Sequence, residues 1–275
     1  MRAQTHEFFA FDTERPPFSK EVEDKELWVP TSKKATVDAI VDAINGHSHV
    51  LLTGEPGAGK TVVLRMVRHL LPQSRFHLTY CHNATLGRRD FYRQLCGAIG
   101  LPTKATAASV FNALTAYVEN LATEATHHPV FLLDECHLMR DDMLDHLHIL
   151  QNYRWDSKAL LSLVLIGLPE LSERLKRRRH RSLMSRVHTR IAIGPLVPDD
   201  TKDYIRYRLA RVGCERSLFP PDAIAVLHEH TGGVIRDIDR IATLALDNAA
   251  RRRTKTVHKD IVLDAINIDM NGGIL

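Results

Sequence analysis

The sequence predicts an α/β fold in which a parallel five-stranded sheet is sandwiched by helices and is followed by a small C-terminal helical domain. Three observations support this prediction. Short apolar segments alternate with segments of helical periodicity up to about residue 193, which is typical of a parallel sheet covered on both faces. A glycine-rich loop separates the first expected strand from the helix after it. Beyond Pro195 only helical spacing remains.

Strands and helices follow from two different apolar patterns. Strands of a parallel sheet are buried on both faces and read as continuous apolar runs, whereas helices repeat their apolar residues every three or four positions. The expected strands are residues 50–52, 76–80, 130–133, 160–166 and 187–193. The expected helices are residues 36–44 and 62–70, segments around 91–99, 110–121 and 139–150, and residues 200–212, 221–230, 235–250 and 258–266.

This pattern divides the chain into three parts. Residues 1–31 mix aromatic residues with prolines and keep no sustained period, so we expect an irregular arm packed on the main domain. Residues 32–195 contain the expected strands and the glycine-rich loop, and we expect them to form one α/β domain. Residues 196–275 form the helical lid domain.

Composition and charge are those of a globular protein with a substantial core. The chain has 275 residues, 44% of them hydrophobic and 25% charged, which is ordinary for such proteins. No apolar run approaches the ~20 residues needed to cross a bilayer, and residues 1–6 lack the apolar core of a secretion signal. We therefore expect no membrane span and a cytoplasmic location. The four cysteines form no C-x-x-C pair, which predicts reduced thiols rather than a zinc site.

One loop carries the clearest chemical signal. Residues 54–61 read G-E-P-G-A-G-K-T and match the G-x-x-x-x-G-K-[ST] pattern in full. Its glycines let the backbone turn so that successive N–H groups cradle phosphates at the positive end of the next helix. Lys60 is expected to neutralise the β- and γ-phosphates, and the Thr61 hydroxyl to hold Mg²⁺. The residues expected to bind the nucleotide here are Gly54, Glu55, Pro56, Gly57, Ala58, Gly59, Lys60, Thr61 and Val62.

Two carboxylates follow the third expected strand. Residues 130–133 end directly in Asp134 and Glu135. In enzymes with this phosphate loop, the first acid of such a pair holds Mg²⁺ directly or through water. The second is placed to polarise the water that attacks the γ-phosphate, as a general base. Asp is also a common helix N-cap, so the pair alone does not indicate catalysis. The phosphate loop upstream favours the catalytic interpretation. Together they predict an ATPase that converts ATP and water to ADP and phosphate, with ATP and Mg²⁺ as cofactors.

An Asp-Glu pair combined with an appended helical domain resembles the AAA+ ATPases, over essentially residues 32–270. The sequence has no guanine-reading N-K-x-D tetrapeptide, which favours ATP over GTP. Within the AAA+ class it is similar to the group of ExeA, TniB, TnsC and MuB, ATPases of secretion and DNA-transposition systems. The resemblance implies a P-loop NTPase fold of the AAA+ type. The segments that carry it are Phe9-Ala10-Phe11, Arg15-Pro16-Pro17-Phe18, Gly54 to Thr61, Leu133 to His137, Leu165 to Leu171 and Thr231 to Arg236.

The resemblance also implies roles for two arginines. Arg236 opens a C-terminal helix and matches the sensor-2 arginine that reaches the γ-phosphate from the lid, so it is an expected catalytic and nucleotide-binding residue. A solvated surface arginine is the alternative. Arg186 matches the arginine finger that completes a neighbouring subunit's site, which makes hydrolysis depend on assembly. Arg181 and Arg190 are close enough in sequence to be alternatives.

One position departs from the family pattern. The polar sensor-1 residue at the end of the fourth strand falls near Leu168, and a leucine cannot orient water. Either another group does this work, or the intrinsic hydrolysis rate is low. Asn83 resembles the polar residue that restrains the catalytic glutamate in other AAA+ proteins, with an ordinary turn asparagine as the alternative.

The first functional hypothesis from this resemblance is a DNA-transposition helper. In it, ATP-bound subunits form a homo-oligomer, a ring or helical filament, on double-stranded DNA, recruit or activate a transposase, and disassemble after hydrolysis. The formal charge is only +4, but the positive residues are clustered, and such clusters attract polyanions. A solvated helix surface is the alternative for the basic segment. The expected DNA-binding residues are Lys176, Arg177, Arg178 and Arg179.

Two other functions stay open. The second hypothesis is an ExeA-like cytoplasmic ATPase of a secretion or envelope-assembly system, which acts on a membrane partner. The third is a nucleotide-sensing interaction module that hydrolyses slowly and signals by oligomerising. A comparison of ATP turnover with and without double-stranded DNA separates the first hypothesis from the others.

Overall fold

A computed structural model describes residues 11, 15–82, 85–102, 106–124, 127–153 and 157–270. The chain forms two compact units. We call residues 35–55 and 63–193 the sheet unit, and residues 1–34, 56–62 and 194–275 the helical unit. Asn83 and the Phe9-Ala10 part of the expected N-terminal signature lie outside the described residues.

The sheet unit contains a five-stranded sheet in which every neighbouring pair is parallel, with the order β2-β3-β4-β1-β5. This confirms the predicted sheet. Its three central strands, β3, β4 and β1, are buried at every position, which explains their continuous apolar runs. The strands are β1 (Val50–Gly54), β2 (Phe76–Cys81), β3 (His128–Leu133), β4 (Ser162–Gly167) and β5 (Thr189–Ile193).

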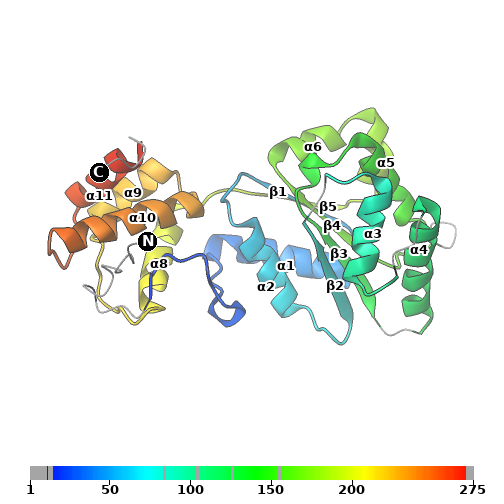
Figure 1. Ribbon diagram of the computed structural model, residues 1–275, viewed down its shortest axis with the longest axis horizontal. Coiled ribbons are helices and arrows are strands. Elements are labelled where there is room, and N and C mark those ends of the chain that lie inside the picture. The colour runs from blue at the N-terminus through cyan, green and yellow to red at the C-terminus, as the bar shows by residue number, and fades with distance from the viewer. Residues whose placement is uncertain are drawn as a thin grey trace. The chain divides into compact units, whose positions relative to one another are not determined.

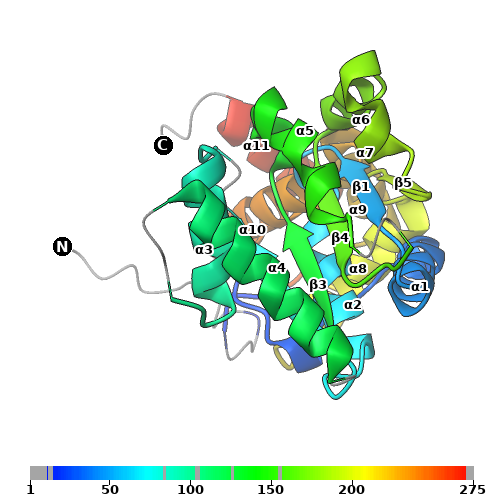
Figure 2. The same cartoon turned by 90° about the vertical axis from the view of Figure 1, so that its right-hand side faces the viewer.

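Helices cover both faces of this sheet (Figures 1 and 2). α1 (Thr31–Asn45) and α2 (Lys60–Leu70) lie on one face, and α3 (Arg88–Ala98), α4 (Ala107–Thr123) and α5 (Asp141–Leu150) on the other. Alternate strand residues point to the second face, because Leu51, Phe131 and Leu163 share one buried cluster with apolar residues of α3, α4 and α5. The predicted sandwich is therefore confirmed.

Short helices that the sequence did not predict connect β4 to β5. They are α6 (Pro169–Leu175), the 3-10 helix η4 (Arg178–His180) and α7 (Arg181–Met184). Each is too short for a helical period to be legible. α6 starts with Pro169 in its first turn, and Leu171 and Leu175 bury the same face four residues apart. Two further 3-10 turns are η2 (Asp24–Glu26) and η3 (Cys136–Leu138).

The helical unit contains α8 (Pro198–Ala210), α9 (Pro221–Thr231), α10 (Ile235–Arg251) and α11 (Lys259–Met270), as predicted (Figure 1). The four helices share one apolar core, to which Phe18 of the N-terminal segment contributes. Gly233 is required where α9 turns into α10: its φ is +77°, and an added Cβ would lie 2.1 Å from the Leu196 carbonyl oxygen.

A buried arginine fixes the N-terminal segment on α8. Arg208 is 5% exposed and donates to the carbonyl oxygens of Pro17 at 2.8 Å and Ser19 at 2.6 Å. Its guanidinium also donates to the Tyr204 hydroxyl at 2.6 Å and lies 3.5 Å from the Asp239 carboxylate, to which Tyr204 donates at 2.6 Å. Burial raises the pKa of Asp239 to about 6, although the Arg208 charge opposes the shift.

Candidate functional site

The predicted acidic pair lies at the carboxyl edge of the sheet. All five strands run parallel, so β1, β3 and β4 end at the same edge. β1 ends at Gly54 and leads directly into the glycine-rich loop, and β3 ends immediately before Asp134. Ligands of open α/β sheets bind at this edge. The fold therefore puts the start of the loop and the two carboxylates at the edge where a ligand is expected.

Asp134 is held by three hydrogen bonds. Its carboxylate accepts from the Tyr80 hydroxyl at 2.6 Å and from the Glu135 N–H at 2.8 Å, and its own N–H donates to the Cys81 carbonyl at 2.8 Å. Burial and the hydrogen bond to Asp134 raise the pKa of Tyr80 well above its usual range, so the phenol stays a donor. The Asp134 carboxylate is thereby held in one orientation, and carboxylate oxygens are the ligand type that Mg²⁺ prefers.

Glu135 differs from its neighbour in exposure and backbone. Its φ is +55°, in the left-handed region that few non-glycine residues adopt. Its side chain is 48% exposed, and its carboxylate lies 3.5 Å from Nδ1 of His137. A carboxylate that is half in solvent and contacts an imidazole can take a proton from water.

His137 was not among the predicted site residues, although it ends the D-E-C-H run. Its Nδ1, which lies near Glu135, also accepts the N–H of Leu168 at 3.4 Å. Gly167 permits this approach, because an added Cβ would lie 3.2 Å from the His137 backbone nitrogen and 3.4 Å from its Nδ1. Arg174 donates to the His137 carbonyl at 2.5 Å. The imidazole thus lies between the catalytic-base candidate and the position where the family pattern expects a polar residue.

The phosphate loop in the helical unit has the backbone that its glycines predict. Gly57 and Gly59 have φ of +79° and +94°. An added Cβ on Gly57 would lie 2.6 Å from Cγ1 of Val234, so the position is closed to larger residues. The N–H of Ile235, at the start of α10, donates to the Gly57 carbonyl at 3.2 Å.

Lys33 also contacts this loop, and the sequence analysis missed it. It is 5% exposed, and its ammonium donates to the carbonyls of Ala58 at 2.5 Å and Gly194 at 2.6 Å. Burial lowers its pKa, and the Asp200 carboxylate acts in the opposite direction. The one signal in the sequence is a lysine in the first turn of a helix, where the helix dipole disfavours a cation.

Lys60 and Thr61 begin α2 directly after the loop, with Val62 next. A helix N-terminus is positive, so the predicted lysine and hydroxyl lie at an anion-favouring position. Arg236 is exposed and is the second residue of α10. Its Cβ would lie 3.3 Å from a Cβ added to Gly57, so this arginine starts beside the phosphate loop.

Arg186 and the basic segment belong to the sheet unit. Arg186 donates to the His148 carbonyl at 3.1 Å and to the Asn152 side chain at 3.3 Å, at the end of α5. Of the expected DNA-binding residues, Arg179 pairs with Asp141 at 2.9 Å and Asp145 at 2.6 Å, and Lys176 pairs with Glu173. These carboxylates offset part of the positive charge. Arg177 and Arg178 are exposed.

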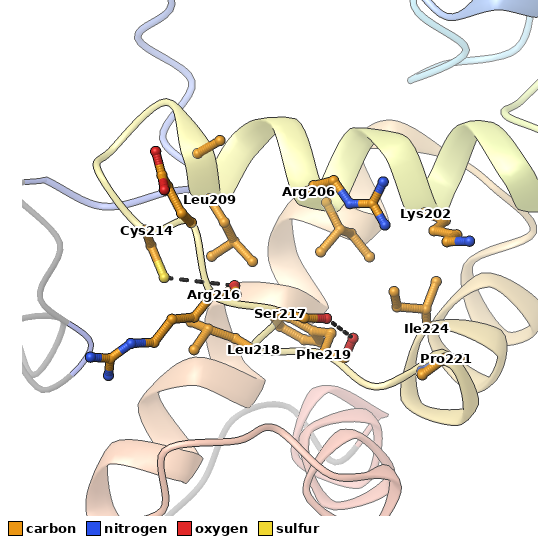
Figure 3. Close-up of a pocket in the computed structure, with 13 residues that line it drawn as sticks. Lys202, Arg206, Leu209, Cys214, Arg216, Ser217, Leu218, Phe219, Pro221 and Ile224 are labelled. Atoms are coloured by element: carbon orange, nitrogen blue, oxygen red, sulfur yellow. Dashed lines mark hydrogen bonds between the residues drawn. The ribbon is translucent and has the colours of Figure 1, made fainter.

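A hollow of about 280 Å³ lies elsewhere in the helical unit, between α8 and the loop before α9 (Figure 3). Its floor is apolar, and Lys202, Arg206 and Arg216 are among its lining residues. Within the loop the Ser217 hydroxyl donates to the Phe219 carbonyl. None of the predicted site residues lines this hollow.

The sequence matches known proteins in two ways. Residues 43–175 match the family model described as an AAA domain. General secretion pathway protein A of Aeromonas hydrophila is 35% identical over 263 residues, which are 94% of this chain and 48% of that protein. The chain thus spans about half the length of this curated relative.

Solved structures share the fold at lower identity. The Aeropyrum pernix ORC1 protein in complex with DNA has a TM-score of 0.66 at 20% identity and covers 88% of this chain and 66% of that one. CDC6P from Pyrobaculum aerophilum has a TM-score of 0.69 at 18% identity, over 90% and 71%. The Thermotoga maritima RuvB branch migration motor has a TM-score of 0.57 at 17% identity, over 92% and 73%.

These comparisons confirm the P-loop AAA+ fold and support an AAA+ ATPase. They give no support to the transposition-helper group or to a transposase partner, and the curated relative agrees with the secretion alternative. Within the described part of the chain, no helix has the length and apolar character to span a membrane.

Proposed function

We propose that the chain is the ATP-hydrolysing part of a secretion system and works as a nucleotide-dependent switch. The single observation that carries the secretion role is the match to general secretion pathway protein A over 94% of the chain. Because the chain spans about half of that relative, the partner on which the ATPase acts is part of the proposal.

The residues described above fit a magnesium–triphosphate group. The phosphate loop offers backbone N–H groups, a helix N-terminus and the charge of Lys60. From the sequence motifs, the Mg²⁺ ligands in this proposal are the Thr61 hydroxyl and Asp134; within the sheet unit the Asp134 carboxylate accepts a hydrogen bond from Tyr80. A cation held by these residues would neutralise charge on the phosphates. Glu135 takes the proton of the attacking water, because its carboxylate is half exposed and lies beside His137.

Two arginines complete the proposed chemistry. Arg236 would serve a γ-phosphate from the start of α10, since its Cβ lies beside Gly57 of the phosphate loop. Arg186 serves a neighbouring subunit as the arginine finger, so it must leave its contacts with His148 and Asn152 on assembly. Both cations stabilise the charge that develops on the transferred phosphoryl group.

The first experiment tests the chemistry. Glu135→Gln should lower kcat for ATP by about 100-fold or more, the range for loss of a general base, while ATP binding remains. Lys60→Ala should abolish ATP binding. Glu170→Gln, an exposed carboxylate on α6, is the matched control and should behave as wild type. Unchanged turnover in Glu135→Gln would refute its assignment as the base.

The second experiment tests the biological role. The Glu135→Gln allele, placed at the native locus, should reduce the amount of protein released into the medium, with the Glu170→Gln allele as control. A transposition reporter and DNA-stimulated ATP turnover are measured in parallel. Normal secretion together with a change in transposition and in the DNA response would refute the secretion role.

A further inference from the structure

Among the residues that the structure describes, Lys33 is a buried cation with no carboxylate among its hydrogen-bond partners. Its two partners are the carbonyl oxygens of Ala58 and Gly194. The nearby carboxylate, Asp200, accepts a hydrogen bond from the neighbouring Ser32. Removing an ammonium from water without a direct counter-ion costs free energy. A methionine of similar size would fill this space without that cost, so the charge itself needs an explanation.

The geometry of the peptide bond supplies one. A trans peptide is planar, and its C=O and N–H point in opposite directions. When Lys33 holds the Ala58 carbonyl, the Gly59 N–H is turned away from Lys33. In the same way the Ile235 N–H holds the Gly57 carbonyl and turns away the N–H of Ala58. Successive backbone N–H groups fixed in this way make an anion-binding concavity.

The charge of Lys33 adds to this orientation. A cation at the carbonyl oxygen polarises the whole peptide, which strengthens the N–H on its other side as a hydrogen-bond donor. A neutral donor at position 33 would orient the Ala58–Gly59 peptide without this effect. The φ of Gly59 is +94°, a value that favours glycine. Because glycine is conformationally free, contacts from outside the loop are needed to keep the Ala58–Gly59 peptide in one orientation.

We propose that Lys33 is a positioning residue of the phosphate loop, which presents the Gly59 N–H to a nucleotide phosphate and ties the loop to Gly194. The proposal rests on the ATPase function proposed above. Gly194 is the first residue of the helical unit after β5, and Lys33 lies one residue before the boundary at 34/35. The Lys33 ammonium thus connects the phosphate loop to the segment that leads into α8. Through this connection, a shift of the loop on nucleotide binding would move that segment.

Three variants separate this role from simple packing. Lys33→Met keeps the length and the apolar stem but removes the charge, and Lys33→Arg keeps the charge. Lys34→Met is the matched control, because Lys34 is the exposed neighbour on the same helix. The dissociation constant for ATP is measured with a fluorescent ATP analogue, and KM and kcat are measured in steady state on the full chain.

Lys33→Met should raise the dissociation constant and KM about 10-fold, equivalent to about 1.4 kcal/mol, and leave kcat within about threefold. Lys33→Arg should recover most of the affinity, and Lys34→Met should match wild type.

If Lys33→Met does not fold, Lys33→Gln replaces it, since an amide can still hold one carbonyl. A folded Lys33→Met or Lys33→Gln with wild-type affinity, or with a loss in kcat alone, overturns the proposal. Absence of ATP binding in both wild type and Lys34→Met overturns the ATPase function instead.

Discussion

The two edges of the sheet carry the same kinds of polar residue and use them differently. At the carboxyl edge, His137 contacts the half-exposed carboxylate of Glu135. At the amino edge, where the strands begin, His49 and His128 are buried at 8% exposure each. The burial and the partners of a histidine, rather than its position beside a strand, therefore decide whether it can take part in chemistry.

At the amino edge every polar partner is internal to the fold. His49 Nδ1 accepts the Leu163 N–H at 3.0 Å, and His128 Nε2 lies 3.0 Å from the Ser162 hydroxyl. The His47 ring stacks on His128 with centroids 3.9 Å apart. Burial lowers the pKa of His49 to about 4 and that of His128 to about 3, so both are neutral at pH 7. Their polar contacts here are with other residues of the sheet unit, which indicates a structural role.

The largest expected effect is a loss of folding stability at low pH, caused by the buried histidines of the amino edge. A histidine with a lowered folded-state pKa stabilises the fold above its unfolded pKa, about 6.5, and this stability is lost as the pH falls towards the folded value. For His49 the loss between pH 6.5 and 4 is about 3 kcal/mol. Urea unfolding followed by far-UV circular dichroism at pH 7.5, 6, 5 and 4 measures it.

His49→Gln keeps an acceptor for the Leu163 N–H and should flatten this pH dependence, whereas the exposed His69→Gln should not. Asp239 in the helical unit has the opposite sign, because its raised pKa of about 6 means that acid favours its folded state. A sheet unit that stays equally stable from pH 7.5 to 5 would contradict the structural role of the amino-edge histidines.

The second expected effect tests whether His137, at the carboxyl edge, contributes to ATP turnover. If its contact with Glu135 positions the base, His137→Ala should lower kcat about 10-fold, close to 1.4 kcal/mol, with KM changed less than about twofold. His137→Asn, whose side-chain oxygen can accept the Leu168 N–H, should recover part of the rate. Steady-state ATP turnover measures both, with His69→Ala as control. A wild-type kcat in a folded His137→Ala would show that Glu135 needs no help from this side.

Local patterns explain which parts of the molecule could be predicted. The sheet followed from apolar runs because β1, β3 and β4 are buried at every position. The strand–loop–helix order of residues 50–70 and the strand–acid order of residues 130–135 are each written in consecutive residues. The contacts of Lys33 with Ala58 and Gly194 join positions 25 and 161 residues apart, and no period or motif records such a distance. His137 was missed for a related reason: its side chain contacts Leu168, which follows β4 and lies 31 residues away along the chain.

The smallest expected effect concerns Tyr80, which supports Asp134 from the neighbouring strand β2. Tyr80→Phe removes the hydroxyl that donates to the Asp134 carboxylate. Because Tyr80 is 47% exposed, water replaces much of this hydrogen bond, and the net loss is about 0.5–1 kcal/mol. The Mg²⁺ concentration for half-maximal ATP turnover should therefore rise about two- to fivefold, with kcat at saturating Mg²⁺ and the free energy of unfolding nearly unchanged.

A Mg²⁺ titration of Tyr80→Phe beside the control Tyr117→Phe, a tyrosine that contacts His77 instead, distinguishes a metal effect from a general loss of sheet stability. If both variants show the same Mg²⁺ dependence, Asp134 does not rely on Tyr80, and the carboxyl edge is less ordered by its own strands than the amino edge is.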